Sequence, residues 1–152
     1  MKLIGDIFDG YRTARDEKIR LLERVPIFEG CSTRQLRAVA DISKVVEVPE
    51  RTVLTRQGEP GEEFFIIVDG TALVTLSMHK KHRLKPGEFF GEMSLLDGGP
   101  RSVTVRAATS LRVLVIDRKN FQGVLREVPD LTQKLLVTLS RRVRALETPE
   151  HP

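Results

Sequence analysis

A glycine, a glutamate and an arginine near the middle of the chain have the types and the spacing to bind a small polar ligand. Gly91 and Glu92 open a stretch that continues through a Gly-Gly-Pro turn to Arg101 and Ser102. The guanidinium of Arg101 is a planar set of donors that matches an anion such as phosphate, and it stays charged at physiological pH. Glu92, nine positions earlier, can accept a hydrogen bond from a hydroxyl group. These residues indicate a ligand that carries both an anion and a hydroxyl, as a sugar phosphate does.

The residues between this glutamate and the arginine favour a tight loop. Met93 to Leu96 is predicted to form one helical turn, whose free N–H groups and positive dipole end would face an anion. Gly91 lets the backbone approach a ligand closely. A structural ion pair between Glu92 and Arg101 at the base of the loop is the alternative interpretation.

The chain around this loop predicts a β domain. From residue 44 to 118, short apolar runs alternate with glycine turns, and Asp69-Gly70 has the composition of a hairpin turn. Many short strands with glycine turns are typical of an antiparallel sandwich or a jelly-roll barrel. The expected strands contain Val45 to Val48, Val53 and Leu54, Phe64 to Val68, Ala72 to Leu76, Leu84, Val103 to Ala107, and Leu111 to Ile116.

Helical periodicity occurs on both sides of this region. The N-terminal segment, residues 1–43, is predicted to contain two helices, and the segment 119–147 two more, followed by a tail at 148–152. The last helix carries an apolar stripe at three-four spacing. The expected helices are Asp16 to Val25, Thr33 to Ile42 with Ser32 as N-cap, Asn120 to Glu127, and Asp130 to Glu147, and the stripe is Leu136, Leu139, Val143 and Leu146.

The composition is that of one globular domain. The chain has 152 residues, of which 40% are hydrophobic and 30% charged. Its single cysteine, Cys31, excludes an intrachain disulfide and fits a reducing compartment. The first residues do not resemble a signal peptide, and no apolar run has the roughly 20 residues of a membrane helix. We therefore expect a cytoplasmic protein without membrane contact.

Charge and histidine patterns weigh against two other functions. The net charge of +4 is concentrated at 79–85 and 141–144. Without interleaved aromatic residues, these clusters favour a solvated surface over a nucleic-acid site. The histidines, His79, His82 and His151, form no His-X-His pattern, so a metal-dependent enzyme of the barrel class is not expected. We expect no catalytic residue, metal or cofactor.

The stretch from Phe89 to Val105, FFGEMSLLDGGPRSVTV, resembles the phosphate-binding cassette of cyclic-nucleotide-binding domains. This family includes catabolite activator proteins, regulatory subunits of cyclic-AMP-dependent kinase and cyclic-nucleotide-gated channels. The resemblance extends from about Leu22 to Leu146. It implies an eight-stranded antiparallel jelly roll with N-terminal helices and two C-terminal helices, which act as a lid. The glycines that carry the resemblance are Gly58, Gly70, Gly87 and Gly91.

The resemblance also implies a ligand and its contacts. Arg101 would bind the cyclic phosphate and Glu92 the ribose 2′-hydroxyl. Ser102 favours cyclic AMP over cyclic GMP, while Val103 replaces the usual alanine and leaves the affinity open. The ligand-binding residues implied by the family are Gly91, Glu92, Met93, Ser94, Arg101, Ser102 and Val103.

The base and the lid involve residues outside the cassette. The family positions correspond to Val74 and, as a weaker candidate, His82, and on the last helix to Arg142, Val143 and Leu146. The apolar stripe of that helix has two open interpretations: a lid over the base, or a packing surface against the barrel or a second copy.

We therefore expect the protein to be a sensor that has no output domain of its own. Binding is expected to shift the C-terminal helices and so to reach an unknown protein partner or a homodimer. The alternatives are an interaction protein with a weak or vestigial nucleotide site, or the regulatory fragment of a larger channel, kinase or transcription factor.

Overall fold

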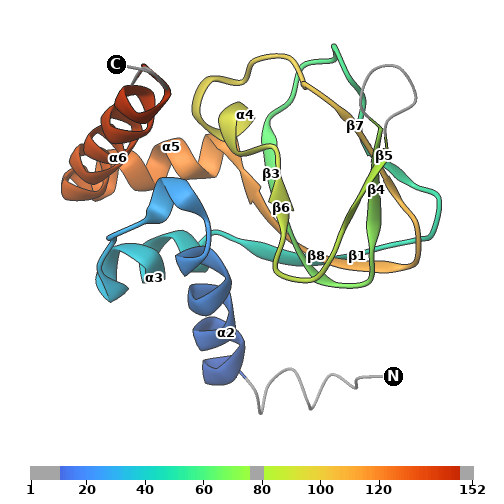
Figure 1. The fold of residues 1–152 in the computed structure, drawn as a ribbon. Coiled ribbons are helices and arrows are strands. Elements are labelled where there is room, and N and C mark those ends of the chain that lie inside the picture. The colour runs from blue at the N-terminus through green and yellow to red at the C-terminus, as the bar shows by residue number, and fades with distance from the viewer. Residues whose placement is uncertain (1–10, 76–80, 148–152) are drawn as a thin grey trace. The chain divides into compact units, whose positions relative to one another are not determined.

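The computed structural model describes residues 11–75 and 81–147 (Figure 1). The chain forms two compact units. One consists of residues 42–122, and the other combines the chain up to residue 41 with the chain from residue 123 onward.

The unit of residues 42–122 contains two antiparallel sheets of four strands each. The predicted antiparallel β architecture with flanking helices is confirmed, while closure of the two sheets into a single barrel stays a prediction. In sheet order, the first sheet has β1 (Lys44–Val48), β8 (Leu111–Asp117), β3 (Glu63–Asp69) and β6 (Phe89–Phe90), and the second has β2 (Val53–Thr55), β7 (Thr104–Ala107), β4 (Ala72–Thr75) and β5 (Lys81–Leu84).

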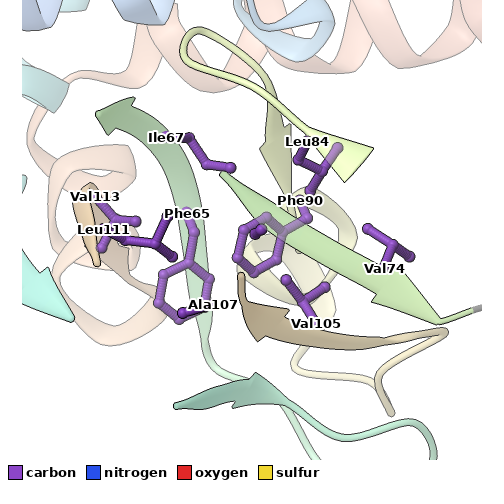
Figure 2. Close-up of a cluster of buried hydrophobic side chains, with 10 residues drawn as sticks. Phe65, Ile67, Val74, Leu84, Phe90, Val105, Ala107, Leu111 and Val113 are labelled. Carbon is purple, nitrogen blue, oxygen red and sulfur yellow. The ribbon is translucent and has the colours of Figure 1, made fainter. Parts of the chain in front are cut away.

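Side chains from both sheets form one hydrophobic core (Figure 2). The rings of Phe65 on β3 and Phe90 on β6 stack with their centroids 4.8 Å apart. Each fully buried side chain of this size stabilises the fold by about 1.5–3 kcal/mol. The core therefore fixes β6, which leads directly into the predicted ligand-binding stretch. Its members are Phe65, Ile67, Ala72, Val74, Leu84, Phe90, Val105, Ala107, Leu111 and Val113.

The turn between β3 and β4 lies where the Asp69-Gly70 pair predicts it. Gly70 has a φ of 87°, a backbone conformation that glycine adopts without strain. A Cβ on Gly70 would lie 2.3 Å from the carbonyl oxygen of Ser110, so a larger residue would not fit. The predicted strand after this turn extends to Leu76, which lies outside the described residues.

The helices of the second unit agree with the predicted regions but not with every boundary. Ser32 caps its helix as expected: its Oγ accepts a 3.1 Å hydrogen bond from the Gln35 backbone, and Gln35 Oε1 accepts a 2.8 Å bond from the Ser32 backbone. The first helix ends before Val25, because Pro26 starts a separate short helix. The helices of this unit are α2 (Tyr11–Glu23), η1 (Pro26–Phe28), α3 (Thr33–Asp41) and α6 (Pro129–Glu147), and α5 (Arg118–Glu127) begins in the unit of residues 42–122 and ends in this one.

Helix α6 packs through a face other than the predicted apolar stripe. Leu131, Leu135 and Thr138 are its buried residues, and the Thr138 hydroxyl donates a 3.5 Å hydrogen bond to the Glu29 carbonyl. The stripe stays largely exposed: Leu136 is 57% exposed, Val143 51% and Leu146 87%. Of the helices in the described ranges, none is long and apolar enough to cross a membrane.

Candidate functional site

A short helix follows β6 at the predicted position. Helix α4 (Glu92–Asp97) is preceded by Gly91 and followed by Gly98, both with positive φ. The Gly98 backbone closes the helix with a 2.9 Å hydrogen bond to the Ser94 carbonyl. The predicted single turn is therefore present, slightly longer than Met93 to Leu96 and starting at Glu92.

The loop between β2 and β3 holds the backbone of Arg101. Pro60 and Pro100 form an isolated antiparallel bridge. Beside it, the Arg101 N–H donates a 2.8 Å hydrogen bond to the Glu59 carbonyl, and the Gly58 N–H donates a 2.9 Å bond to the Arg101 carbonyl. These bonds fix the backbone on both sides of the arginine, and so they define the direction in which its side chain leaves the chain.

The side chain of Arg101 is buried against β3. Arg101 is only 8% exposed, and its Nη1 donates a 2.7 Å hydrogen bond to the carbonyl of Glu63. Its Cζ atom lies 5.8 Å from the centre of the Phe65 ring, within the range of a cation–π contact. Within the described ranges, Arg101 forms no ion pair with a carboxylate. A buried cation that forms no direct ion pair favours the binding of an anion.

Burial and a nearby carboxylate act in opposite directions on this group. Burial lowers the pKa of the Arg101 guanidinium, and the Glu63 carboxylate raises it. Arginine is a very strong base, so the side chain stays cationic at physiological pH. Each charge-assisted hydrogen bond to an arriving anion would contribute about 1.5–3 kcal/mol.

Two glycines leave the space that the guanidinium occupies. A Cβ on Gly91 would lie 2.7 Å from Arg101 Nη1 and 2.9 Å from the Glu63 carbonyl oxygen. A Cβ on Gly61 would lie 2.1 Å from Arg101 Nε. Gly91 is among the residues predicted from sequence, whereas Gly61 and the Glu63 carbonyl are not. The only sequence signal for Gly61 is a loop glycine that follows Pro60.

Glu92 and the two residues that follow it differ in their exposure to solvent. Glu92, the first residue of α4, is half-buried, and Met93 is 54% exposed. Ser94 is buried, and its hydroxyl donates a 3.4 Å hydrogen bond to the Gly99 carbonyl. The Ser94 side chain therefore closes the loop, which leaves its backbone as the group available to a ligand.

Ser102 and Val103 follow the arginine toward β7. Ser102 is exposed, so its hydroxyl is accessible. Val103 is half-buried and packs against the core, and its carbonyl accepts a 3.0 Å hydrogen bond from Thr55 Oγ1. The extra methyl groups of Val103, relative to alanine, thus face the sheets.

The residues predicted for the base lie on β4 and β5. Val74 and His82 are directly opposite each other in the sheet, so their side chains share a face. Val74 is buried and His82 is exposed. The structure therefore brings these two candidates together. The lid candidates lie on α6 in the other unit: Arg142 is half-buried, and Val143 and Leu146 are exposed.

A small polar hollow adjoins Arg101. Its volume is about 160 Å³, which is below the range of about 300–1,000 Å³ for small-molecule sites. A larger hollow of about 610 Å³ lies at Asp69 and Arg112, away from the β3 end that holds Arg101. No group of three or more metal-ligating side chains occurs in the described part of the chain. The smaller hollow is lined by Val53, Leu54, Thr55, Arg56, Glu59, Pro60, Glu62, Glu63 and Arg101.

Comparison with known families identifies the fold that carries this arginine. Residues 45–128, more than half of the chain, match the model of the cyclic nucleotide-binding domain. The chain belongs to the cyclic nucleotide-binding domain family. The predicted resemblance is thus confirmed, and the matched segment contains both sheets, α4 and Arg101.

Relatives of this cyclic nucleotide-binding domain occur in larger proteins. The chain is 34% identical to the cyclic nucleotide-gated potassium channel mll3241 of Mesorhizobium japonicum over 75% of its own length and 32% of the channel. The chain spans about a third of the length of the curated relatives it matches.

Solved structures of the family have the same fold. The N-terminal domain of a transcriptional regulator from Streptomyces coelicolor has a TM-score of 0.73 at 26% identity, covering 84% of this chain and 92% of that one. The regulatory domain of Toxoplasma gondii PKA, solved with cAMP, has a TM-score of 0.64 at 28% identity, covering 83% and 51%. Cyclic nucleotide-binding domains of this kind are regulatory.

Proposed function

We propose that this domain binds cyclic AMP and that binding regulates a partner or another part of a larger protein. The observation that carries the proposal is the environment of Arg101, which is buried, cationic and without an ion pair in the described ranges. A cyclic nucleotide phosphate bears one negative charge and would form a direct ion pair with Arg101. Backbone bonds already orient the arginine, so little ordering would be required on binding.

The other predicted residues take complementary roles in this proposal. Glu92 accepts a hydrogen bond from the ribose 2′-hydroxyl. This bond gives a role to a carboxylate that would otherwise only repel the nearby phosphate. Gly91 and the backbone of Met93 and Ser94 line the phosphate, and the exposed hydroxyl of Ser102 donates to the phosphate or the base. Val103 packs against the core and so supports the cassette from the side of the sheets.

The base contacts support a preference for cyclic AMP over cyclic GMP. Val74 offers an apolar contact on the core side of β4, with His82 beside it. Ser102 has a counterpart in bacterial regulators that bind cyclic AMP, and one structural relative was solved with cAMP. Cyclic GMP is the second ligand to test.

Helix α6 transmits the signal in this proposal. Its packed face uses Leu131 and Leu135, so Val143 and Leu146 are available to cover the base or to contact a second copy. Arg142 directly precedes Val143 on the same helix. Ligand binding would favour the conformation in which this apolar surface is covered, which is a population shift.

The proposed role is regulatory rather than catalytic, and the proposed location is cytoplasmic rather than membrane-bound.

A second candidate function is the regulatory part of a larger channel. The specific observation for it is that the curated relatives are potassium channels about three times the length of the matched segment.

Calorimetric titration with cyclic AMP and cyclic GMP tests the proposal. We expect binding of cyclic AMP with a lower Kd than cyclic GMP, and at least about a tenfold higher Kd for Arg101→Ala. Arg106→Ala is the matched control, because it removes an exposed arginine from β7 and should leave the Kd unchanged. A folded protein that binds neither nucleotide would refute the proposal, and equal affinity of Arg101→Ala and the parent would refute the role of the arginine.

A further inference from the structure

Strand β5 forms a free edge of the second sheet. In the order β2-β7-β4-β5, β5 pairs with β4 on one side and with no other described strand. An edge strand presents backbone N–H and C=O groups that can pair with another extended chain. This edge is therefore able to accept an additional strand.

Basic side chains on the edge strand β5 and on β7 lie on one face of the sheet. The register pairs Thr75 with Lys81, and Leu73 with Arg83 on one side and Arg106 on the other. Because directly opposed residues share a face, Lys81, Arg83 and Arg106 project from the same side. All three are exposed.

No carboxylate neutralises these charges in the described part of the chain. Lys81, Arg83 and Arg106 form no ion pair there. Arg83 donates a 3.1 Å hydrogen bond to Thr71 Oγ1, which holds its guanidinium over the sheet. The face therefore carries three exposed positive charges that pair with no carboxylate of the described residues.

The positive charge selects among strands that could pair with β5. A second copy of β5 would place Lys81 and Arg83 near like charges, which destabilises pairing. A strand with acidic side chains at alternate positions would instead place its carboxylates opposite these two residues. Alternate residues of a strand are about 6.6–6.8 Å apart along the chain, the same spacing that separates Lys81 from Arg83.

We propose that the free edge of β5 binds an extended acidic segment of a partner protein as an added strand. The carboxylates of that segment pair with Lys81 and Arg83, and the residues between them face the side of His82 and Leu84. Backbone hydrogen bonds contribute affinity and the alternating charges contribute specificity. The proposal does not rest on nucleotide binding at Arg101. An anionic lipid surface would use the charges but not the free backbone edge.

Nuclear magnetic resonance titration of the labelled full chain tests the proposal. The probe is a ten-residue peptide in which Glu alternates with Thr, and the matched peptide has five Glu followed by five Thr. We expect the largest amide shifts in β5 and binding of the alternating peptide at least about tenfold tighter than of the blocked one. Phosphatidylserine vesicles are the third probe.

Charge-reversal variants distinguish binding at the β5 edge from attraction by the net charge of the protein. Lys81→Glu with Arg83→Glu should weaken binding of the alternating peptide at least about tenfold. Arg20→Glu with Arg37→Glu, two exposed positions on α2 and α3, changes the net charge equally and should change the affinity less than about twofold. If the reversal in β5 lowers the thermal midpoint, Lys81→Gln with Arg83→Gln should still weaken binding.

Three outcomes would overturn the proposal. The first is equal binding of both peptides, or equal loss in both double variants, which indicates attraction by net charge alone. The second is vesicle binding through Lys81 and Arg83 without peptide binding, which indicates a lipid surface. The third is no binding of the alternating peptide at millimolar concentration.

Discussion

Nη1 of Arg101 donates a 2.7 Å hydrogen bond to the backbone carbonyl of Glu63. This bond joins the end of the loop after α4 to the start of β3, so the orientation of the guanidinium depends on the backbone of a core strand. The same arginine is held through its own backbone by Glu59 and Gly58. Arg101, the residue proposed to bind the phosphate, is therefore held through both its side chain and its backbone before any nucleotide binds.

Gly61→Ala should displace Arg101 and weaken cyclic AMP binding. The added Cβ would lie 2.1 Å from Arg101 Nε, so the side chain or the loop has to move. We expect at least about a tenfold higher Kd by calorimetry.

Gly58→Ala is the matched control in the same loop. Gly58 has a φ of +86° and no atom within 4 Å of an added Cβ, so the new methyl group would not contact Arg101 and could act only through the backbone, whose N–H donates to the Arg101 carbonyl. We expect it to cost about 1–2 kcal/mol of stability and to raise the Kd less than Gly61→Ala does. A larger loss of affinity in Gly58→Ala than in Gly61→Ala would contradict the role assigned to Gly61.

Gly123→Ala should stabilise the protein. Gly123 lies within α5, and a Cβ there meets no atom within 4 Å. Alanine has a higher helix propensity, so the free energy of unfolding should rise by about 0.5–1 kcal/mol. Urea denaturation measures the change, and a decrease in stability would show that α5 lacks this space in solution.

Asp130 should make stability fall at acid pH. Loss of hydration raises the pKa of its carboxyl, but the hydrogen bond from Gln35 and the charge of Arg34 act more strongly together and hold that pKa below its usual range. A carboxyl with a lowered folded-state pKa contributes stability above its unfolded pKa of about 3.9 and loses it as pH falls further.

Thermal unfolding between pH 6 and 2.5 measures this contribution. Asp130→Asn should be less stable than the parent at pH 6, and the difference should shrink toward the acid end. A difference that is independent of pH would mean that the Asp130 charge does not contribute.

Cys31 should react slowly with alkylating reagents at neutral pH. Burial raises the pKa of its thiol, and the nearby Lys134 ammonium partly opposes this effect. Because the thiolate is the nucleophile, the rate with iodoacetamide should rise at a higher pH than for a free thiol. Lys134→Gln should move the rise to still higher pH, and an unchanged or lower midpoint in that variant would contradict the contact.

Features set by local interactions were predictable from sequence. Ser32 caps α3 through bonds to Gln35, only three residues away, and Asp69-Gly70 turns β3 into β4. Both depend on neighbouring residues whose chemistry is visible in the chain. The short helix after Gly91 was predictable for the same reason.

Features set by long-range packing were not predictable. Helix α6 carries apolar residues on two faces, and the spacing alone does not show that Leu131 and Leu135 pack while Leu136 stays exposed. The acceptor for Arg101 is a backbone carbonyl at Glu63, which every residue type has. Gly61 is visible only as a loop glycine until Arg101 is placed beside it.

A backbone acceptor has a consequence for how the site can be tuned. Any residue at position 63 keeps the carbonyl that orients Arg101, while its side chain sets the charge nearby. Glu63→Gln would remove the carboxylate that raises the pKa of Arg101 and leave the 2.7 Å bond in place. Orientation and charge at this arginine are thus separately adjustable, so ligand affinity can be varied by one exposed side chain without rebuilding the loop.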